Sequence, residues 1–220
     1  MPSYEGKSYY QNKDVARQYG AQFTGSLTLA NLRAKLYGLR EEAVFLRLLN
    51  NVPEGGTVLD VPAGTGRYVD HLLSRGFVVG GVDVSPQMLE IARQRIGNNP
   101  NLLFLKVADA VELPFREREF SGVTCMRLYH RTPPEIRRKM LAEVRRVSQG
   151  WAILYFGWTN GWLALRRSIR SLFLRGRPSN PHPVTMSQLR SELHSVGMQL
   201  EEAGWVLPGL ADGMLVRVSW

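Results

Sequence analysis

The 220-residue sequence predicts an α/β fold with a doubly wound, mostly parallel sheet, and two observations support this. Short apolar runs alternate with segments of helical periodicity between residues 57 and 156. Such alternation is typical of parallel strands that are joined by right-handed helical crossovers. In addition, two of the apolar runs end in a carboxylate, Asp60 and Asp83, and a glycine turn follows the first of them.

Before the sheet, residues 1–50 are expected to form a helical N-terminal cap. Apolar residues recur there at the spacing of one helix face, which predicts that this face packs on the sheet. These residues are Leu29, Leu32, Leu36, Leu39, Ala43, Leu46 and Leu49.

The core at 57–157 contains the alternating elements. Strands are predicted at 57–61, 77–82, 102–107, 122–128 and 151–156, and helices at 65–75, 86–96 and 134–147. Local signals agree with these bounds. Ser85 can cap a helix that begins at Pro86, and Gly76 and Gly97 lie where helices should stop.

The remaining residues form a basic helical insertion at 158–183 and a C-terminal helix and hairpin at 184–220. The insertion carries five arginines and no acid, with an apolar helical face that includes Trp162 and Phe173. Such a helix can dock on the sheet, cover a substrate pocket, or contact an anionic membrane through residues 161–177. The C-terminal part predicts a helix at 185–196 and strands at 198–206 and 214–220.

Length and composition indicate one globular domain over residues 1–220. The single cysteine rules out an intrachain disulfide framework, and the polar first 20 residues do not fit a secretory signal, so we expect a cytoplasmic protein. The net charge of +9 is compatible with an anionic partner or simply with a soluble, arginine-rich surface.

Several kinds of chemistry find no support in the sequence. The four histidines are scattered and there is no acidic calcium loop, so no metal site is predicted. The motifs of phosphoryl-transfer loops and of nucleophile elbows are also missing. Cys125 lies within an apolar strand, which argues against a nucleophilic role.

The turn that follows the first strand separates two classes of nucleotide site. Dinucleotide folds require a third glycine, which the run 64–69 lacks, whereas Asp60 adds an acid just before the turn. With Asp83, the run Ala108-Asp109-Ala110 and the run Leu113-Pro114-Phe115, the sequence resembles class I S-adenosylmethionine-dependent methyltransferases. It is most similar to their small-molecule family of the ubiquinone-biosynthesis type. One departure is Pro62 followed by Ala63, where many members have the first glycine.

The resemblance implies a Rossmann-like sheet of seven strands, with one antiparallel strand that the C-terminal hairpin adds at the sheet edge. It also implies S-adenosyl-L-methionine as cofactor and S-adenosyl-L-homocysteine (SAH) as product. The residues expected to bind this cofactor are Asp60, Ala63, Gly64, Gly66, Asp83, Val84, Met88, Asp109, Ala110 and Met126.

Each of these residues has an expected partner on the cofactor. Asp83 should accept the ribose hydroxyls and Asp60 should lie beside the methionine ammonium, whereas the turn backbone should line the carboxylate end. Asp109 should reach the adenine amino group, with Ala110 offering its amide and with Val84 and Met88 packing on the ring. For the three aspartates the alternative is a structural role in a helix cap or a turn, and for Met88 it is a place in the core.

Substrate contacts are expected just after the fourth strand. His130 is the candidate general base, because an unperturbed histidine pKa near 6.5 suits proton removal; the alternative is a loop histidine bonded to backbone. Arg127 and Arg131 could bind a carboxylate or phosphate of the acceptor, or simply be solvated. Tyr10 in the cap is expected to touch bound ligand, with packing as the alternative.

These observations predict methyl transfer to a small organic acceptor, with oxygen favoured and nitrogen, sulfur and carbon left open. Three alternatives remain. The acceptor could be a lipophilic quinone-type molecule, or the protein could bind the cofactor without transferring its methyl group. A nucleic-acid substrate is favoured by the charge but disfavoured by the run Arg127-Leu128-Tyr129-His130, which lacks the signature of base-amine methyltransferases.

Overall fold

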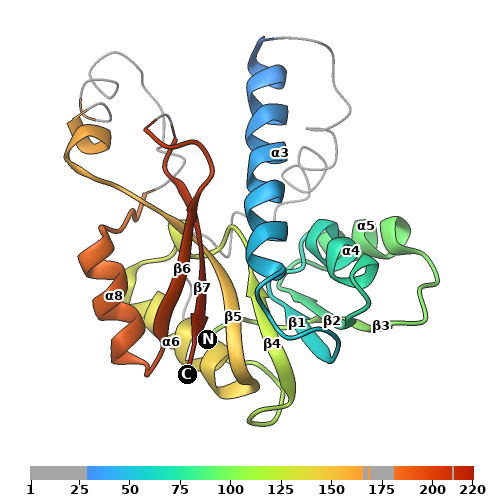
Figure 1. Ribbon diagram of the computed structural model, residues 1–220. Helices are drawn as coiled ribbons and strands as arrows, with labels where there is room; N and C mark the ends of the chain where they lie inside the picture. The colour runs from blue at the N-terminus through green and yellow to red at the C-terminus, as the bar shows by residue number, and fades with distance from the viewer. Residues whose placement is uncertain (1–28, 166–167, 169–180, 210) are drawn as a thin grey trace.

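A seven-stranded sheet forms the centre of the computed structural model, which describes residues 29–165, 168, 181–209 and 211–220 (Figure 1). The elements are α3 (Leu29–Leu49), β1 (Thr57–Asp60), α4 (Arg67–Ser74), β2 (Val78–Asp83), α5 (Pro86–Ile96), β3 (Leu102–Val107), β4 (Phe120–Cys125), the 3₁₀ turn η1 (Tyr129–Arg131), α6 (Pro134–Val147), β5 (Ser148–Gly157), α8 (Met186–Ser195), β6 (Gln199–Trp205) and β7 (Gly213–Ser219). The strand order is β3-β2-β1-β4-β5-β7-β6.

The predicted seven-stranded sheet with one antiparallel strand is confirmed, but that strand is not at the edge. β7 runs antiparallel to both β5 and β6 and lies between them, so β6 forms the edge. Burial explains this order. Most residues of β7 are buried, whereas β6 carries Glu201 and Glu202 and keeps only one fully buried residue, Gly204. The more apolar strand therefore occupies the inner position.

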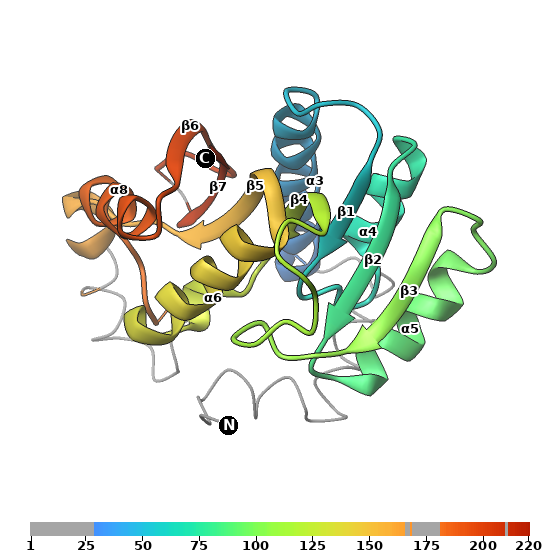
Figure 2. The same ribbon diagram turned by 90° about the horizontal axis from the view of Figure 1, so that it is seen from below.

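Helices cover both faces of the sheet and divide the core in two. Side chains of α3, α4 and α5, such as Phe45, Leu72 and Leu89, belong to one buried cluster. Those of α6 and α8, such as Leu141 and Leu189, belong to the other. Figure 2 shows α4 and α5 beside β1 to β3, and α6 and α8 beside the other half of the sheet. This is the doubly wound arrangement that the alternation of elements predicted.

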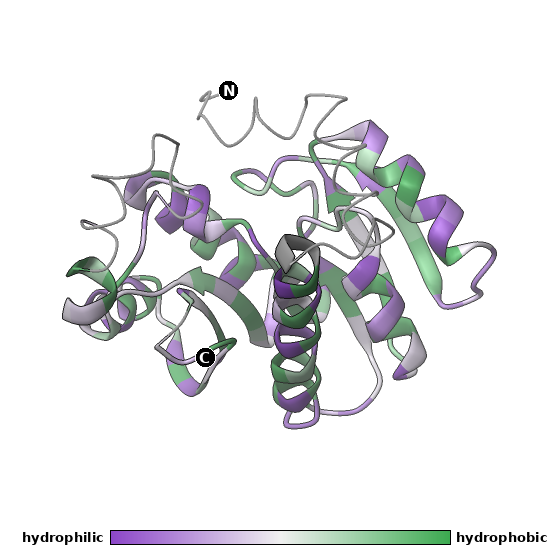
Figure 3. Cartoon of the chain, turned by 90° about the horizontal axis from the view of Figure 1, so that it is seen from above, coloured by the Kyte–Doolittle hydropathy of each residue, from purple (hydrophilic) through white to green (hydrophobic). Residues whose placement is uncertain are grey.

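Helix α3 packs through a different face from the one predicted. The buried residues of the helix include Gly38, Glu41, Phe45 and Leu48, whereas the predicted face is exposed over much of its length. Its exposed leucines are Leu32, Leu36 and Leu39. Figure 3 shows hydrophobic and hydrophilic residues mixed along α3. The prediction was wrong because the true contact face contains a glycine and an acid, which hydrophobic periodicity does not count.

The described part of the predicted insertion does not dock through the expected side chains. Residues 161–165 are helical, and in this turn Leu163 is buried while Trp162 and Leu165 are more than half exposed. The rest of the predicted apolar face, including Phe173, lies outside the described residues. Among the helices that the structure describes, none has the length and apolar character that a bilayer span requires.

The packing of β4 on β5 gives a test of the core. Gly122 of β4 lies against Trp151 of β5, and a Cβ atom added at Gly122 would overlap the indole ring. Gly122→Ala should therefore lower the free energy of unfolding by about 1 to 3 kcal/mol, the usual cost of overpacking. Urea denaturation measures this. Gly150→Ala is the matched control, because a Cβ at Gly150 meets open space; equal effects of the two changes would contradict the packing.

Candidate functional site

The turn after β1 is shaped by two glycines with left-handed backbone. Gly64 has φ +52° and Gly66 has φ +78°, conformations that favour glycine. At Gly66 a Cβ would come within 3.0 to 3.1 Å of Ala92, so this glycine also lets α4 approach α5 closely. At Gly64 a Cβ would meet no atom within 4 Å. Gly66 thus serves packing, whereas the Gly64 backbone faces open space.

Asp83, at the end of β2, binds this turn to the neighbouring strand. Its carboxylate accepts hydrogen bonds from the Gly64 amide at 2.9 Å and from the Ser85 amide at 2.8 Å. Ser85 caps α5 by accepting from the Met88 amide, which confirms the predicted cap. Burial raises the pKa of Asp83 to about 6, although the amide hydrogen bonds oppose this shift.

Asp60, at the end of β1, lies in the interior behind the turn. Its side chain is fully buried, and one oxygen accepts a hydrogen bond from the Thr124 hydroxyl at 2.5 Å. The other oxygen has no hydrogen-bond partner within the described part of the chain. Burial raises the pKa of Asp60 to about 7, and the nearby Asp83 charge adds to this rise.

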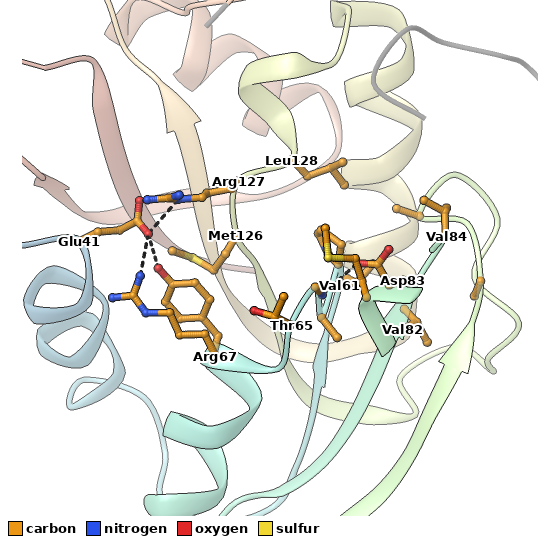
Figure 4. Close-up of a pocket in the computed structure, with 17 residues that line it drawn as sticks. Glu41, Val61, Thr65, Arg67, Val82, Asp83, Val84, Met126, Arg127 and Leu128 are labelled. Carbon is orange, nitrogen blue, oxygen red and sulfur yellow. Dashed lines mark hydrogen bonds and ion pairs between the residues drawn. The ribbon is translucent and has the colours of Figure 1, made fainter. Parts of the chain in front are cut away.

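A pocket opens between the carboxyl ends of the strands and α3, with about 930 Å³ of empty space that is partly open to solvent (Figure 4). The lining residues are Glu41, Val61, Pro62, Ala63, Gly64, Thr65, Arg67, Tyr68, Val82, Asp83, Val84, Met88, Ala108, Ala110, Met126, Arg127 and Leu128.

The two ends of the pocket differ in chemistry (Figure 4). At one end a single carboxylate, that of Asp83, lies among apolar residues such as Val84 and Val82. At the other end lies a group of charged and polar side chains that we call the Glu41 cluster. Its members are Glu41, Arg67, Tyr68 and Arg127.

The Glu41 cluster joins three parts of the chain. Arg127 donates through Nε to both carboxylate oxygens of Glu41, at 3.0 and 2.9 Å, and the Tyr68 hydroxyl donates to the same carboxylate. Arg67 approaches Glu41 to 4.0 Å and also pairs with Glu42 at 2.8 Å. The Glu41 carboxylate is fully buried, so these partners offset the cost of removing it from water.

Arg127 reaches Glu41 because β4 ends earlier than expected. The predicted strand at 122–128 stops at Cys125, and Arg127 has a left-handed backbone with φ +54°. The prediction missed this turn because residues 126–128 include apolar Met126 and Leu128, which extend the strand pattern. Burial lowers the pKa of Arg127, but the Glu41 charge, the neighbouring Tyr68 and Tyr155 and the hydrogen bond to Glu41 together more than offset this, so Arg127 stays protonated.

The pocket brings together most of the expected cofactor residues. Those that line it are Ala63, Gly64, Asp83, Val84, Met88, Ala110 and Met126, together with Arg127 from the expected substrate set. Asp60, Gly66, Asp109 and Arg131 are not among the lining residues. The Asp109 carboxylate accepts a hydrogen bond from the Val111 amide at 3.2 Å, as in the turn-capping alternative. Tyr10 lies outside the described residues.

His130 does not have the environment expected of a general base. The residue is 8% exposed, it does not line the pocket, and Arg131 donates to its Nε2 at 3.2 Å. Burial, followed by the charges of Arg131 and Arg127, lowers the pKa of His130 to about 3. With this pKa His130 is a weak base at neutral pH. The unperturbed value near 6.5, on which the expected base role depends, applies to a solvated ring, so the base role of His130 stays a prediction.

Sequence reasoning missed the residues of the cluster other than Arg127. Arg67 and Tyr68 directly follow the glycine turn, which could have placed them in the first turn of α4 beside the ligand. Glu41 carries no comparable signal, because an acid within an amphipathic helix is normally solvated. Within the described residues, no group of three histidines, cysteines or acids could hold a metal ion.

The chain is similar in sequence to known methyltransferases. Residues 58–149 match the model of a methyltransferase domain family. A demethylmenaquinone methyltransferase of Deinococcus radiodurans is 39% identical over 70 residues, which cover 31% of this chain and 29% of that protein. A tRNA (carboxymethyluridine(34)-5-O)-methyltransferase of Arabidopsis thaliana is 32% identical over 112 residues, 50% of this chain and 26% of that protein.

Among solved structures, a magnesium protoporphyrin IX methyltransferase from Synechocystis with bound SAH superimposes with a TM-score of 0.78. It is 17% identical and covers 97% of each chain, so the likeness concerns the fold. Residues 58–149, less than half of the chain, therefore match a methyltransferase domain, and the sheet around this segment has the fold of the solved methyltransferase. The chain spans less than a third of the length of the two curated relatives.

The raised pKa of Asp60 predicts how stability depends on pH. Between about pH 4 and pH 7 the folded protein holds a proton on Asp60 that the unfolded chain has lost, so this group's contribution to stability falls as pH rises. Asp60→Asn removes the titrating group. The free energy of unfolding should therefore fall less between pH 5 and pH 8 than in the unmodified protein, by on the order of 2 kcal/mol.

Chemical denaturation at a series of pH values measures this decline. Asp70→Asn is the control, because Asp70 is exposed on α4. If Asp60→Asn and the unmodified protein lose stability equally between pH 5 and pH 8, Asp60 is not the buried acid described here.

Proposed function

We propose that the protein transfers the methyl group of S-adenosyl-L-methionine to a small organic acceptor, at an oxygen atom. The observation that carries this proposal is the pocket between α3 and the segment that matches a methyltransferase domain, with Asp83 at one end and the Glu41 cluster at the other. The cofactor has a matching difference between its ends, because one end is a nucleoside and the other is a charged amino-acid tail.

The residues at the Asp83 end fit a nucleoside. An ionised carboxylate offers about four acceptor positions, and the backbone amides of Gly64, Ser85 and Val84 do not use all of them, so the Asp83 carboxylate can also accept from a ribose hydroxyl. Val84 and Met88 supply apolar contacts for adenine, and Ala110 also lines the pocket. The open space at Gly64 lets a ligand approach the turn backbone closely.

The expected roles of the other acids stay part of the proposal. Asp60 would act on the methionine ammonium from behind the turn, through its oxygen that has no partner within the described residues. The backbone of Ala63, Gly64 and Gly66 would line the carboxylate end. Asp109 would accept from the adenine amino group in addition to the Val111 amide, because a carboxylate has more acceptor positions than this one hydrogen bond uses.

Methyl transfer requires alignment of the acceptor atom with the methyl group and the sulfur. A bound cofactor supplies the electrophilic methyl group. Met126 and Leu128 line the pocket in which the acceptor would meet it. Because His130 is a weak base, oxygen acceptors that are already ionised at neutral pH, such as carboxylic acids and acidic phenols, fit this site best. Arg131 remains a candidate for binding such an anion.

A lipophilic quinone-type acceptor is the second candidate. The relatives named above act on a menaquinone precursor, a tRNA nucleoside and a porphyrin, which are chemically diverse acceptors. Exposed Trp162 and Leu165 in the described part of the basic insertion favour an apolar acceptor or contact with an anionic membrane. Methylation of nucleic acid and cofactor binding without transfer are the remaining alternatives.

An acceptor screen with methyl-labelled S-adenosyl-L-methionine tests the proposed reaction. Three acceptor groups are compared, namely phenolic and carboxylic acids, prenylated quinol precursors in anionic vesicles, and RNA. Label on an oxygen of the first group, with matching release of SAH, supports the proposal. Label on a quinol or on RNA supports an alternative, and bound cofactor without any SAH release identifies a binding protein.

Asp83 gives the prediction for cofactor affinity. Asp83→Asn removes the charge that accepts the ribose hydroxyls and should weaken SAH binding by about 1.5 to 3 kcal/mol, or about 10- to 150-fold. Isothermal titration calorimetry measures the change, with Asp70→Asn as a control that keeps full affinity. Unchanged SAH affinity in Asp83→Asn would exclude the ribose assignment.

A further inference from the structure

The Glu41 cluster closes the pocket at the end opposite Asp83, and one of its members comes from outside the matched methyltransferase segment. Glu41 lies on α3, whereas Arg67 and Tyr68 begin α4 and Arg127 lies in the turn after β4. Figure 4 shows Arg67 and Arg127 directed toward Glu41 from two sides. A buried carboxylate therefore fixes side chains from two other parts of the chain at the pocket wall.

The shape of a nucleoside cofactor determines which of its parts reaches this wall. In a ribose ring the base and the 5′ substituent lie on opposite sides of the hydroxyl pair. With the hydroxyls on Asp83 and the base toward Val84 and Met88, the 5′ substituent must extend past Gly64 and Thr65. The pocket continues in that direction as far as Arg67 and Arg127.

The charges of the cluster match a zwitterion. The amino-acid tail of the cofactor carries one carboxylate and one ammonium group and has no net charge. On the wall, two arginines lie beside Glu41, and Glu42 pairs with Arg67 from outside the lining set. The two arginines can thus bind the carboxylate of the tail, while Glu41 and Glu42 balance their charge, so the wall carries no excess charge against a tail that is neutral overall.

Glu41 has a distinct task within this arrangement. Its oxygens already accept hydrogen bonds from Arg127 Nε and from the Tyr68 hydroxyl. Burial, and then the Glu41 charge, raise the pKa of Tyr68, so this hydroxyl keeps its proton and remains a donor. The carboxylate therefore orients its neighbours and holds the left-handed Arg127 in one position.

We infer that Glu41 is a positioning residue for the amino-acid tail of the cofactor, acting through Arg127 and Arg67, and that α3 is part of the cofactor site. This inference rests on the proposed function. It adds that affinity for the tail, and not for the nucleoside, depends on an acid outside the glycine-turn motif. Occupation of the tail site should in turn stabilise the docking of α3 on the domain.

Two ligands separate the tail from the nucleoside. SAH carries the full amino-acid tail, whereas 5′-deoxy-5′-methylthioadenosine ends in a methylthio group. Both are titrated by calorimetry into the full chain, into Glu41→Gln and into Glu90→Gln, a control at an exposed acid of α5. Glu41→Gln should weaken SAH binding by about 10- to 100-fold and leave methylthioadenosine binding within about twofold.

A second variant keeps the test decisive if Glu41→Gln does not fold. Arg127→Lys retains the positive charge but lacks the guanidinium Nε that donates to both Glu41 oxygens. It should therefore show the same selective loss of SAH affinity. Equal losses for both ligands, or no loss for SAH, would overturn the inference. If the unmodified chain binds neither ligand, it is the proposed function that fails.

Discussion

The hydrogen bond from the Gly64 amide to the Asp83 carboxylate is the contact on which the site depends. It joins the turn after β1 to the end of β2, two adjacent parallel strands whose carboxyl ends meet at the same edge of the sheet. From β1 the chain adds β2 and β3 on one side of the sheet and then returns to add β4 on the other side of β1. Open parallel sheets bind ligands at this change of direction. Without this contact the turn and the acid would not face one pocket.

The second constraint is the burial of Glu41. Its side chain is fully buried and interacts with Arg67 and Arg127, so the long helix α3 cannot shift without exposing or unpairing charges. Figure 1 shows that the first half of α3 extends beyond α4 and α5, while its second half packs beside the sheet. The helix thus closes one end of the pocket through its middle residues, and the pocket owes its polar end to an element that precedes the domain core.

Elements with strong local signals could be predicted from the sequence. The bounds of α5 agree with the prediction because Ser85, Pro86 and Gly97 mark where this helix begins and ends, and the bounds of β3 agree as well. The end of β4, the face of α3 and the place of β7 could not be predicted, because each depends on contacts between distant residues. In the site, Asp83 follows a recognisable turn, whereas Glu41 and Arg127 interact across 86 residues. The pKa of His130 likewise depends on burial that local sequence does not reveal.

The central claim is that one pocket holds an adenosyl cofactor with its ribose on Asp83 and its amino-acid tail toward Glu41 and Arg127. A crystal structure of the protein with SAH tests this most directly. The account predicts ribose hydroxyls within hydrogen-bond distance of the Asp83 carboxylate and the tail carboxylate next to Arg127 or Arg67. Density for SAH in the reverse orientation, or at another place on the protein, would contradict it.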